Sequence, residues 1–457
     1  MTSKTVSISS EPSRDIPARE GWTMLVSLGF ATTVAIWIVG YLSFIGPGRA
    51  IGELLFAMML LLVLIGGVLA GRYRTGGVAD LRKGMLAGGW TGMIVAIFNL
   101  LIVGSLVRSN TLGEVLGWLL GLFLVSILLG AVGGMIGGIK RGASRLRRTS
   151  PLSVFSTVLA CTVFMLLFSG GLVTGLEAGL AVPDWPNSFG HNMLLYPLRN
   201  WEGGIFFEHA HRLYGMLVGV GVVTFLVLVF LNDRRRWMRI CSILLLLMVI
   251  IQGLMGGFRV TEISILLAII HGVFGQLVFV SVVMMASFTT MFWRSSTVRT
   301  PHESTENDRF LTALLPLALV LQLILGACLR HLQVMSPDGE SLLLPQWAMY
   351  THITFGVIAF ALAILVGLRA WGAYPDQRLV HRLGQAVMIV VSLQFVLGII
   401  ALVYVLIRSG VMPPPMEVIF TSMHQATGAI LLALSALLFI WHRRLVEPMP
   451  SRSSSTH

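Results

Sequence analysis

Charged residues and cysteines are both scarce in this sequence. Only 11% of its 457 residues are charged, whereas 56% are hydrophobic, and the mean hydropathy is +0.85. This composition lies outside the range of soluble globular domains. All three cysteines, Cys161, Cys241 and Cys328, fall inside apolar runs. We therefore expect small packing residues there, and neither a disulfide framework nor a cysteine metal cluster.

Long polar stretches are equally few, because apolar runs of about 20 residues recur along the whole chain. Each run is long enough to cross a hydrocarbon core of about 30 Å as a helix. The sequence thus predicts an all-α polytopic membrane protein. Its spans are expected at about 22–43, 51–71, 84–107, 112–138, 152–176, 205–231, 238–258, 264–292, 310–329, 346–371, 384–407 and 417–441.

Acidic residues are outnumbered by basic ones, 20 to 32, which gives a net charge of +12. The basic residues lie in short loops, so the partner they indicate is membrane lipid and not nucleic acid. With the N-terminus in the cytoplasm, 25 Lys and Arg fall in cytoplasmic segments and 7 in exterior ones. Both termini are therefore expected in the cytoplasm. Acidic residues near the N-terminus and the lack of a small-residue cleavage site favour the bacterial cytoplasmic membrane.

Histidine is absent from the first four spans. Residues 1–149 are expected to form an N-terminal four-helix membrane extension followed by a basic linker. The fourth span carries glycines at small-xxx-small spacing, which lets helix backbones approach closely. We predict a packing or assembly role, and a homo-oligomer is compatible with it. The glycines are Gly130, Gly133, Gly134, Gly137 and Gly138.

The remaining eight spans repeat as two four-helix halves, residues 150–300 and 301–457, with a plain polar linker expected at 293–309. Three pairs of motifs match, and in each a glycine follows the named residue at i+4. They are His211 with His352 at an offset of 141, Gln252 with Gln394 at 142, and His271 with His424 at 153. An internal duplication explains all three.

Four of the histidines lie at one depth. His211, His271, His352 and His424 are each six or seven residues inside an exterior helix end, which is about 10 Å deep. A lone membrane histidine is more often packed or water-bonded, but two repeat-related pairs favour ligation. Zinc would need three or four converging ligands. The pairwise layout favours haem iron between histidines of facing helices, His211 with His271 and His352 with His424.

A glycine follows each of these histidines by one helical turn. Residues i and i+4 share a helix face, so we expect a flat surface there, against which a planar macrocycle could lie. His209 lacks this pattern, and His209 and His331 are left without a role.

The two halves differ in one acidic residue. Glu208 lies three residues before His211, on about the same helix face, whereas Met349 holds the aligned place before His352. Glu417 precedes His424 by seven residues and is expected at the membrane surface. The first pocket therefore has an acid/base group and the second does not. The alternative is that Glu208 only pairs with Arg212 at i+4.

Arginines gather at the exterior helix ends beside the histidines, where they could pair with haem propionates. The alternative is ordinary interfacial snorkelling. The exterior loop at 177–207 is longer than a connection needs, and such loops often cover sites. The arginines are Arg212, Arg259, Arg330 and Arg408.

Taken together, the motifs of residues 152–441 resemble those of the haem A synthase family, and residues 1–149 lie outside the resemblance. The motifs are Gly179-Leu180-Ala181-Val182-Pro183-Asp184-Trp185-Pro186, Glu208-His209-Ala210-His211-Arg212, the stretch Gln252 to Val260, His271 with Gly275-Gln276, Leu325 to His331, His352, and His424 to Ala429.

The resemblance implies eight helices in two pseudo-symmetric halves, with haem b held by His352 and His424. It also implies that haem O enters near His211 and His271, where its C8 methyl group is oxidised to a formyl group to give haem A. Glu208 matches the family's essential acid. The implied partners are a haem O-producing farnesyltransferase, cytochrome oxidase assembly proteins and an electron donor. Many members carry a cysteine pair in the first exterior loop, but Val182 stands in that place and the loop has no cysteine.

Two other classes of protein fit parts of the pattern. One is a di-haem membrane cytochrome b that only transfers electrons, for instance from quinol. The other is a transporter built from repeats, with histidines as proton sites. The carboxylate present in only one half and the Trp-containing exterior loop favour the enzyme.

Overall fold

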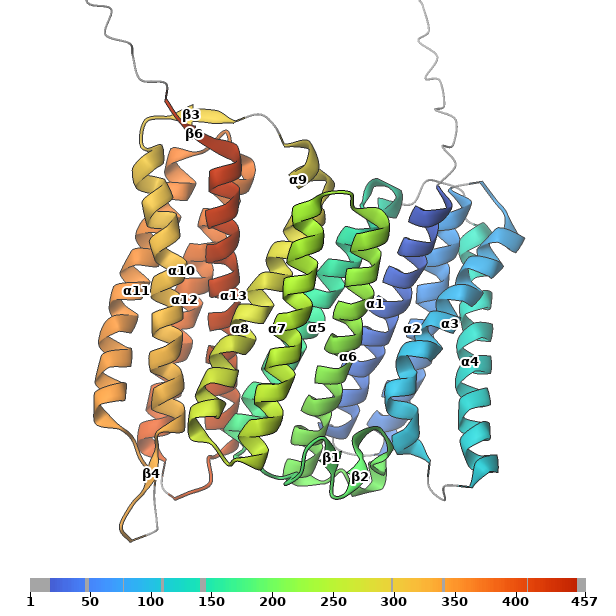
Figure 1. The fold of residues 1–457 in the computed structure, drawn as a ribbon, viewed down its shortest axis with the longest axis horizontal. Coiled ribbons are helices and arrows are strands. Elements are labelled where there is room, and N and C mark those ends of the chain that lie inside the picture. Colours follow the sequence, from blue (N-terminus) through green and yellow to red (C-terminus); the bar gives the residue numbers. More distant parts are fainter. Residues whose placement is uncertain are drawn as a thin grey trace, which may run out of the picture. The chain divides into compact units, whose positions relative to one another are not determined.

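Twelve helices in the computed structural model are long and apolar enough to cross a membrane (Figure 1), which confirms the predicted all-α polytopic membrane protein. The structure describes residues 17–45, 49–76, 78–107, 111–139, 145–296, 299–338, 342–408 and 410–449. The long helices are α1 (Ala18–Ile45), α2 (Arg49–Thr75), α3 (Leu81–Leu106), α4 (Leu112–Ile139), α5 (Pro151–Gly175), α6 (Gly203–Asn232), α7 (Arg236–Thr261), α8 (Ile265–Thr289), α10 (Thr305–His331), α11 (Gln346–Ala373), α12 (Arg378–Ile407) and α13 (Pro415–Leu445).

Two of the helix starts follow ordinary capping rules. The Ser264 side chain accepts a hydrogen bond from the Leu267 backbone N–H at the start of α8. Pro415 lies in the first turn of α13, where backbone N–H groups have no acceptor within the helix, so a residue without an N–H costs no hydrogen bond there. Within hydrocarbon, the helix satisfies every interior backbone group by itself, and this is why apolar runs of this length form helices.

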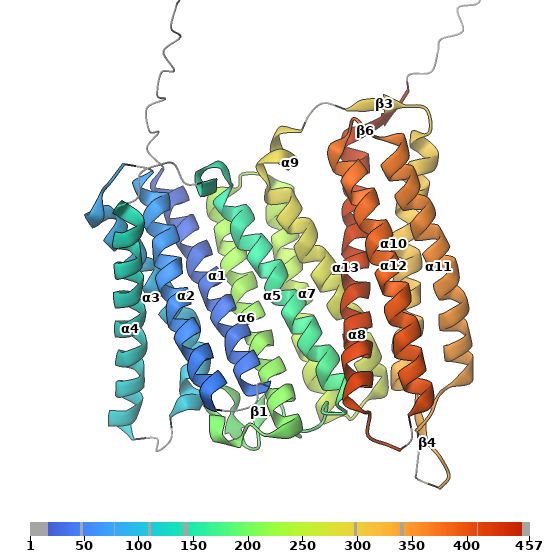
Figure 2. The same cartoon turned by 180° about the vertical axis from the view of Figure 1, so that it is seen from behind.

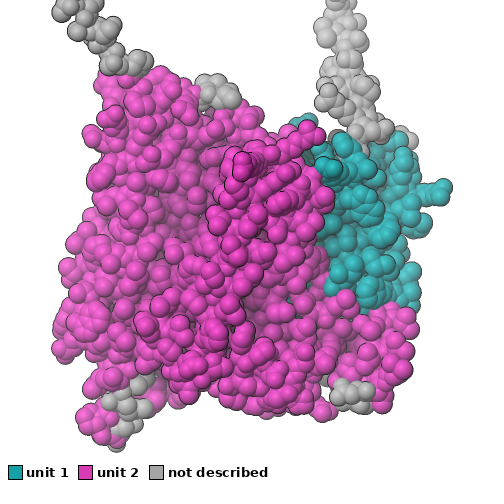
Figure 3. Space-filling view, viewed as in Figure 1, with its two compact units in different colours: residues 1–97, 121–151 teal, residues 98–120, 152–457 magenta. Residues whose placement is uncertain are grey.

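The chain divides into two compact units, residues 1–97 with 121–151 and residues 98–120 with 152–457 (Figure 3). In the first unit, glycines bring α2, α3 and α4 into backbone contact. A methyl group added to Gly67 or Gly88 would meet the carbonyl oxygen of Gly130. Gly134 lies between Gly71 of α2 and Gly84 of α3 in the same way. The close approach predicted from the small-xxx-small spacing is therefore confirmed.

The second unit contains the two four-helix sets α5–α8 and α10–α13. Helices α10, α11, α12 and α13 pack against their neighbours in sequence, α13 also packs on α10, and α8 contacts both α10 and α13 (Figure 2). Leu315, Val387, Leu431 and Leu438 belong to the buried core of the second set. In the first set, the Phe155 and Phe225 rings stack across α5 and α6.

Short strands and turns close the ends of the second unit. At one end β1 (Asn187–Ser188) pairs with β2 (His191–Asn192), and β4 (Val334–Met335) pairs with β5 (Leu342–Leu343). Two single turns, η2 (Met193–Leu195) and η3 (Leu198–Asn200), complete the loop before α6. A further turn, η1 (Arg145–Arg148), precedes α5. At the opposite end, β3 (Thr300–His302) pairs in parallel with β6 (Val446–Pro448).

Residues 293–309, which were expected to be a plain polar linker, include regular secondary structure, so that expectation was wrong. It contains the short helix α9 (Met291–Ser295), which Thr290 caps by accepting from the Trp293 N–H, and the strand β3. Residues 297 and 298 lie outside the described residues. The Arg309 side chain donates to the Val446 carbonyl at 3.0 Å, which ties the start of α10 to the end of the chain.

Replacing Gly134 by leucine should destabilise the first unit, because the new side chain would meet the backbone of α3. Overpacking of this kind costs roughly 1–3 kcal/mol. Gly121→Leu on the same helix is the matched control, since no described atom lies within 4 Å of its added methyl group. Thermal unfolding in detergent should show a lower midpoint for Gly134→Leu only. Equal midpoints for the two variants would contradict the packing.

Candidate functional site

Each of the four histidines expected at one depth contacts a glycine on the helix that precedes it. A methyl group added to any of these glycines would lie 2.8–2.9 Å from Cε1 of the imidazole ring. A side chain there would push the ring away, so glycine is what lets the two helices hold the histidine. The pairs are Gly170 with His211, Gly256 with His271, Gly326 with His352 and Gly398 with His424.

In three of the four pairs, a glutamine lies one turn before that glycine and its amide reaches the histidine. Gln252 Nε2 is 3.4 Å from His271 Nε2, Gln322 Nε2 is 3.0 Å from His352 Nδ1, and Gln394 Nε2 is 3.3 Å from His424 Nε2. Gln322 was missed from the sequence. The Gln-xxx-Gly motif of Gln252 and Gln394 also occurs in the first span of the second half, where Gln322 precedes Gly326 by four residues. A search for this motif would have found Gln322.

The same amides occupy the helix face beside three of the glycines that follow the histidines. Methyl groups added to Gly275, Gly356 and Gly428 would lie 2.9, 3.0 and 3.1 Å from the three amide nitrogens. The expectation of an open flat surface at these glycines was therefore wrong, because the preceding helix supplies a side chain to each.

The first pair departs from this arrangement. Leu166 stands where the other helices have glutamine. His211 Nδ1 is instead 3.0 Å from the Ser169 hydroxyl. No described atom lies within 4 Å of a methyl group added to Gly215. The surroundings of His211 thus differ from those of the other three histidines, and sequence reasoning had overlooked both Leu166 and Ser169.

The structure brings the histidines together as two pairs. The ring centres of His352 and His424 are 6.4 Å apart, and the planes of the two rings are nearly perpendicular. His211 and His271 lie close enough to interact electrostatically. Two imidazoles on opposite sides of one metal ion, with metal–nitrogen bonds of about 2.0–2.1 Å, have ring centres roughly 6–6.5 Å apart. The second pair fits a single iron between two histidines.

A metal-binding imidazole normally donates its other N–H to a fixed acceptor, which orients the ring. His424 Nδ1 is 3.2 Å from the Gln394 carbonyl, one turn before Gly398. The other three histidines differ from His424: Nδ1 of His211 lies 3.0 Å from the Ser169 hydroxyl, Nδ1 of His352 lies 3.0 Å from the Gln322 amide nitrogen, and Nδ1 of His271 has no hydrogen-bond partner among the described residues. The other ring nitrogen of His424, Nε2, is the one that would bind a metal ion, in place of its 3.3 Å contact with the Gln394 amide nitrogen.

Glu208 is buried and both of its oxygens are engaged. Its side chain is only 5% exposed; Oε1 pairs with Arg212 Nη2 at 2.6 Å, and Oε2 accepts from the Val182 backbone N–H at 2.8 Å. The ion pair at i+4 considered as the alternative is therefore present. The carboxylate does more than pair, however, because it also holds the backbone of the exterior loop.

Arg212 and Arg259 fasten that loop to α6 and α7. Arg212 Nη1 donates to the Asp184 carbonyl at 2.6 Å and to the Asn187 carbonyl at 3.0 Å, while Nη2 donates to the Val182 carbonyl at 2.8 Å. Arg259 Nη2 donates to the Gly179 carbonyl at 3.1 Å.

The Trp185 ring is part of the same attachment. It contacts Gly257, the residue after the glycine that holds His271, and lies near the Phe258 ring. The loop therefore covers the helix ends that carry the first histidine pair.

Arg330 and Arg408 also bond to groups of the protein. Arg330 donates to the Thr174 carbonyl and pairs with Glu177 at 2.7 Å. Arg408 pairs with Glu417 at 3.0 Å. Glu417 is only 4% exposed, so it is buried within the protein, and its expected depth at the membrane surface stays a prediction. It is buried because α13 packs on α5, where Val418 meets Gly175.

The remaining polar groups of the loop stabilise its own shape. Asp184 accepts the backbone N–H groups of Phe189 and Gly190, each at 2.7 Å. Burial tends to raise the pKa of Asp184, but these hydrogen bonds and the charge of Arg212 outweigh it, and the pKa is lowered. His209 is fully buried against Trp201, with ring centres 4.6 Å apart, and belongs to the packing of the loop.

These contacts define a polytopic helical membrane protein with one histidine pair in each half. The chain belongs to the family described as cytochrome oxidase assembly protein, whose model matches residues 196–436, more than half of its length. A protein named heme A synthase from Staphylococcus saprophyticus subsp. saprophyticus is 26% identical over 142 residues, which is 31% of this chain and 45% of that protein. The match thus spans less than half of that relative. The resemblance to the haem A synthase family is confirmed.

Arg212→Gln should release the exterior loop, because a neutral amide cannot replace three charge-assisted bonds to loop carbonyls. Each bond of this kind contributes about 1.5–3 kcal/mol. Hydrogen exchange of the backbone around residues 182–188 should become more than about tenfold faster. Arg199→Gln removes an exposed charge from the same loop and should leave exchange unchanged. Unaltered protection in Arg212→Gln would show that the loop is held by other contacts.

Proposed function

We propose that the chain is a haem A synthase, which oxidises the C8 methyl group of haem O to a formyl group and so supplies haem A for cytochrome oxidase. Membership of the family supports a role in haem A biosynthesis. The observation that carries the finer proposal is the buried carboxylate of Glu208 beside only one of two similar histidine pairs. Two equivalent electron-transfer sites would not need this difference.

The second half is proposed to hold a resident haem b between His352 and His424. Their ring spacing of 6.4 Å supports this role. When bound, this haem supplies one-electron redox chemistry. Gln322 contacts Nδ1 of His352 through its side-chain amide, and Gln394 contacts Nδ1 of His424 through its backbone carbonyl, which would direct Nε2 of each ring toward the haem iron.

The first half is proposed to receive haem O between His211 and His271. Leu166 in place of glutamine removes one polar side chain from this pocket, which suits an apolar substrate that must enter and leave. The Trp185 loop would exclude water from the reacting edge.

Arg259 is the best candidate for a propionate partner in the first half. Within the described part of the chain, it alone among Arg212, Arg259, Arg330 and Arg408 has no carboxylate partner. The positive charges of Arg212, Arg330 and Arg408 are each balanced by a paired glutamate. We propose that these arginines contribute to propionate binding through their remaining N–H donors and shape the exterior ends of the pockets.

Glu208 is proposed to take a proton from the bound substrate or to balance positive charge on it. Its carboxylate, three residues before His211 on α6, is fixed by the Val182 N–H and Arg212, so its position needs no rearrangement during the reaction. Conversion of a methyl to a formyl group, written with water as the oxygen source (R–CH3 + H2O → R–CHO + 4 H+ + 4 e−), releases four electrons and four protons, and an oxidant outside this chain must accept the electrons.

The proposed setting is the bacterial cytoplasmic membrane, with both termini in the cytoplasm and the haem sites toward the exterior. The reaction implies a haem O-forming farnesyltransferase upstream and cytochrome oxidase assembly proteins downstream. One observation favours a second candidate, a di-haem cytochrome b: all four histidines share the same glycine contact. The presence or absence of haem A in cells decides between the two.

Glu208→Gln should abolish haem A formation in cells that make haem O, since a neutral amide cannot accept the proton. Loss of a general acid–base group typically lowers a rate about 10²–10⁴-fold. The measurement is extraction and chromatography of non-covalent haems. Glu202→Gln, at an exposed site six residues earlier, should behave as wild type. Normal haem A in Glu208→Gln would remove its proposed role, and no haem A from the wild type would refute the enzyme.

His352→Met and His211→Met should have separate effects. The first should change the absorption spectrum of the haem b that co-purifies with the protein, because it alters an axial ligand. The second should leave that spectrum unchanged and block turnover. Optical spectra of both purified variants, with haem extraction from the same cells, test this. Equal disturbance of one resident haem by both substitutions would mean that the halves do not divide the work.

A further inference from the structure

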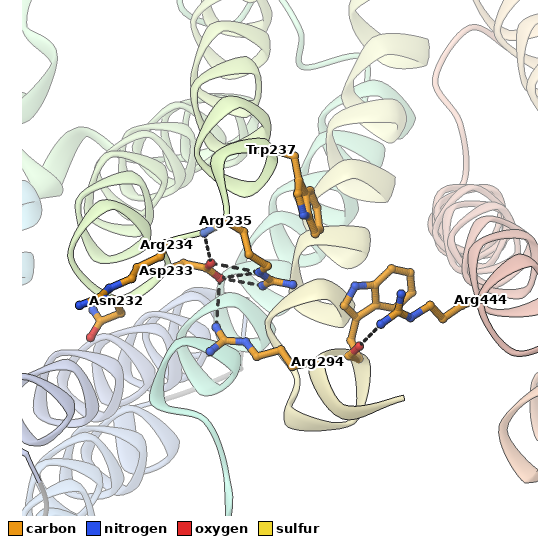
Figure 4. Close-up of a pocket in the computed structure, with 8 residues that line it drawn as sticks. Asn232, Asp233, Arg234, Arg235, Trp237, Arg294 and Arg444 are labelled. Atoms are coloured by element: carbon orange, nitrogen blue, oxygen red, sulfur yellow. Dashed lines mark hydrogen bonds and ion pairs between the residues drawn. The ribbon is translucent and has the colours of Figure 1, made fainter. Parts of the chain in front are cut away.

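A basic pocket lies at the end of the second unit that carries α9 and β3, far along the helices from the histidine pairs. Its volume is about 350 Å³. The loop between α6 and α7, the start of α7, helix α9 and the end of α13 line it (Figure 4). The residues are Asn232, Asp233, Arg234, Arg235, Trp237, Trp293, Arg294 and Arg444.

One carboxylate organises the arginines of this pocket without neutralising them. Asp233 pairs with Arg235 at 2.7 Å and with Arg294 at 3.1 Å. Burial tends to raise the pKa of Asp233, but the hydrogen bonds and charges of these two arginines lower it, so the carboxylate stays ionised. Arg234 and Arg444 also line the pocket, so its lining contains four arginines and one aspartate, which leaves three positive charges in excess.

The arginines outside the Asp233 pairs are the ones available to a ligand. Arg444 donates to the Trp293 carbonyl at 3.0 Å, and its buried Nε has no hydrogen-bond partner among the described residues. Arg234 is exposed and also lines the pocket. Fork-shaped guanidinium groups match the oxygens of a phosphate group.

Apolar surface next to the pocket argues for a lipid and against a soluble anion. Trp237 and Ile240 of α7 are 41% and 47% exposed, and Met291 and Phe292 of α9 are 58% and 52% exposed. Tryptophan at a helix end marks the level of the lipid head groups. A phosphate in the pocket would therefore have room beside it for acyl chains along α7 and α9.

We propose that this pocket binds the phosphate group of an anionic phospholipid. Basic pockets between membrane helices, on the face that the charge distribution assigns to the cytoplasm, are suited to such head groups. The site is separate from the haem chemistry and does not depend on it.

The test uses the full chain in nanodiscs of mixed phosphatidylcholine and phosphatidylglycerol, with retained lipid measured by native mass spectrometry. The wild type should retain phosphatidylglycerol in preference to phosphatidylcholine, and less of it at high salt. Arg234→Gln/Arg444→Gln leaves the Asp233 ion pairs intact and should lower this retention by roughly 30-fold. Inorganic phosphate should not displace the lipid.

Arg236→Gln/Arg443→Gln is the matched control, because it removes the same charge from the neighbouring residues outside the pocket lining. It should retain lipid as the wild type does, and both variants should unfold at the wild-type temperature. Equal retention by the two double variants, or no preference for the anionic lipid in the wild type, would overturn the proposal. Displacement by inorganic phosphate would show that the pocket binds a soluble anion instead.

Discussion

The contact between each histidine ring and a glycine of the preceding helix is the constraint on which the second unit depends. An imidazole inside a membrane protein needs both room and a polar partner. The glycine provides the room, and the backbone one turn earlier can provide the partner, as the Gln394 carbonyl does for His424. All four helix pairs share the glycine contact, so the spacing within each pair and the position of each ring are set together, whereas the polar partner of the ring differs from pair to pair.

Duplication explains why the two halves are alike, and a few substitutions explain how they differ. Gln322 and Gln394 support the second pair, which suits a cofactor that stays bound. In the first pair, Leu166 and Ser169 replace that support around His211, and Glu208 is added on the same helix. A similar fold can thus hold one haem permanently and receive another as a substrate, which is the division that the proposed function requires.

The twelve spans could be predicted because hydrocarbon thickness dictates the length of each apolar run. The histidine pairs followed from the repeat, since duplicated helices place equivalent residues at equivalent depths. The strand β3 could not be predicted, because Thr300 pairs with Val446 far along the chain. Likewise the burial of Glu417 depends on how α13 packs against α5, and the partners of Arg212 depend on the path of the exterior loop. The spacing of residues along one helix contains no information about how that helix packs against another or about the path of a loop.

The Glu208–Arg212 pair joins the loop to the chemistry. A buried ion pair adds little stability by itself, because removing both charges from water offsets their attraction. This pair is nevertheless completed by the loop: Val182 donates to the carboxylate, and the Val182, Asp184 and Asn187 carbonyls accept from the guanidinium. Moving the loop away would leave both charges with fewer partners. The carboxylate therefore has all of its partners only when the loop lies over the helix ends of the first histidine pair, and under the proposed function the position of the loop and the position of the proposed acid–base group are set together.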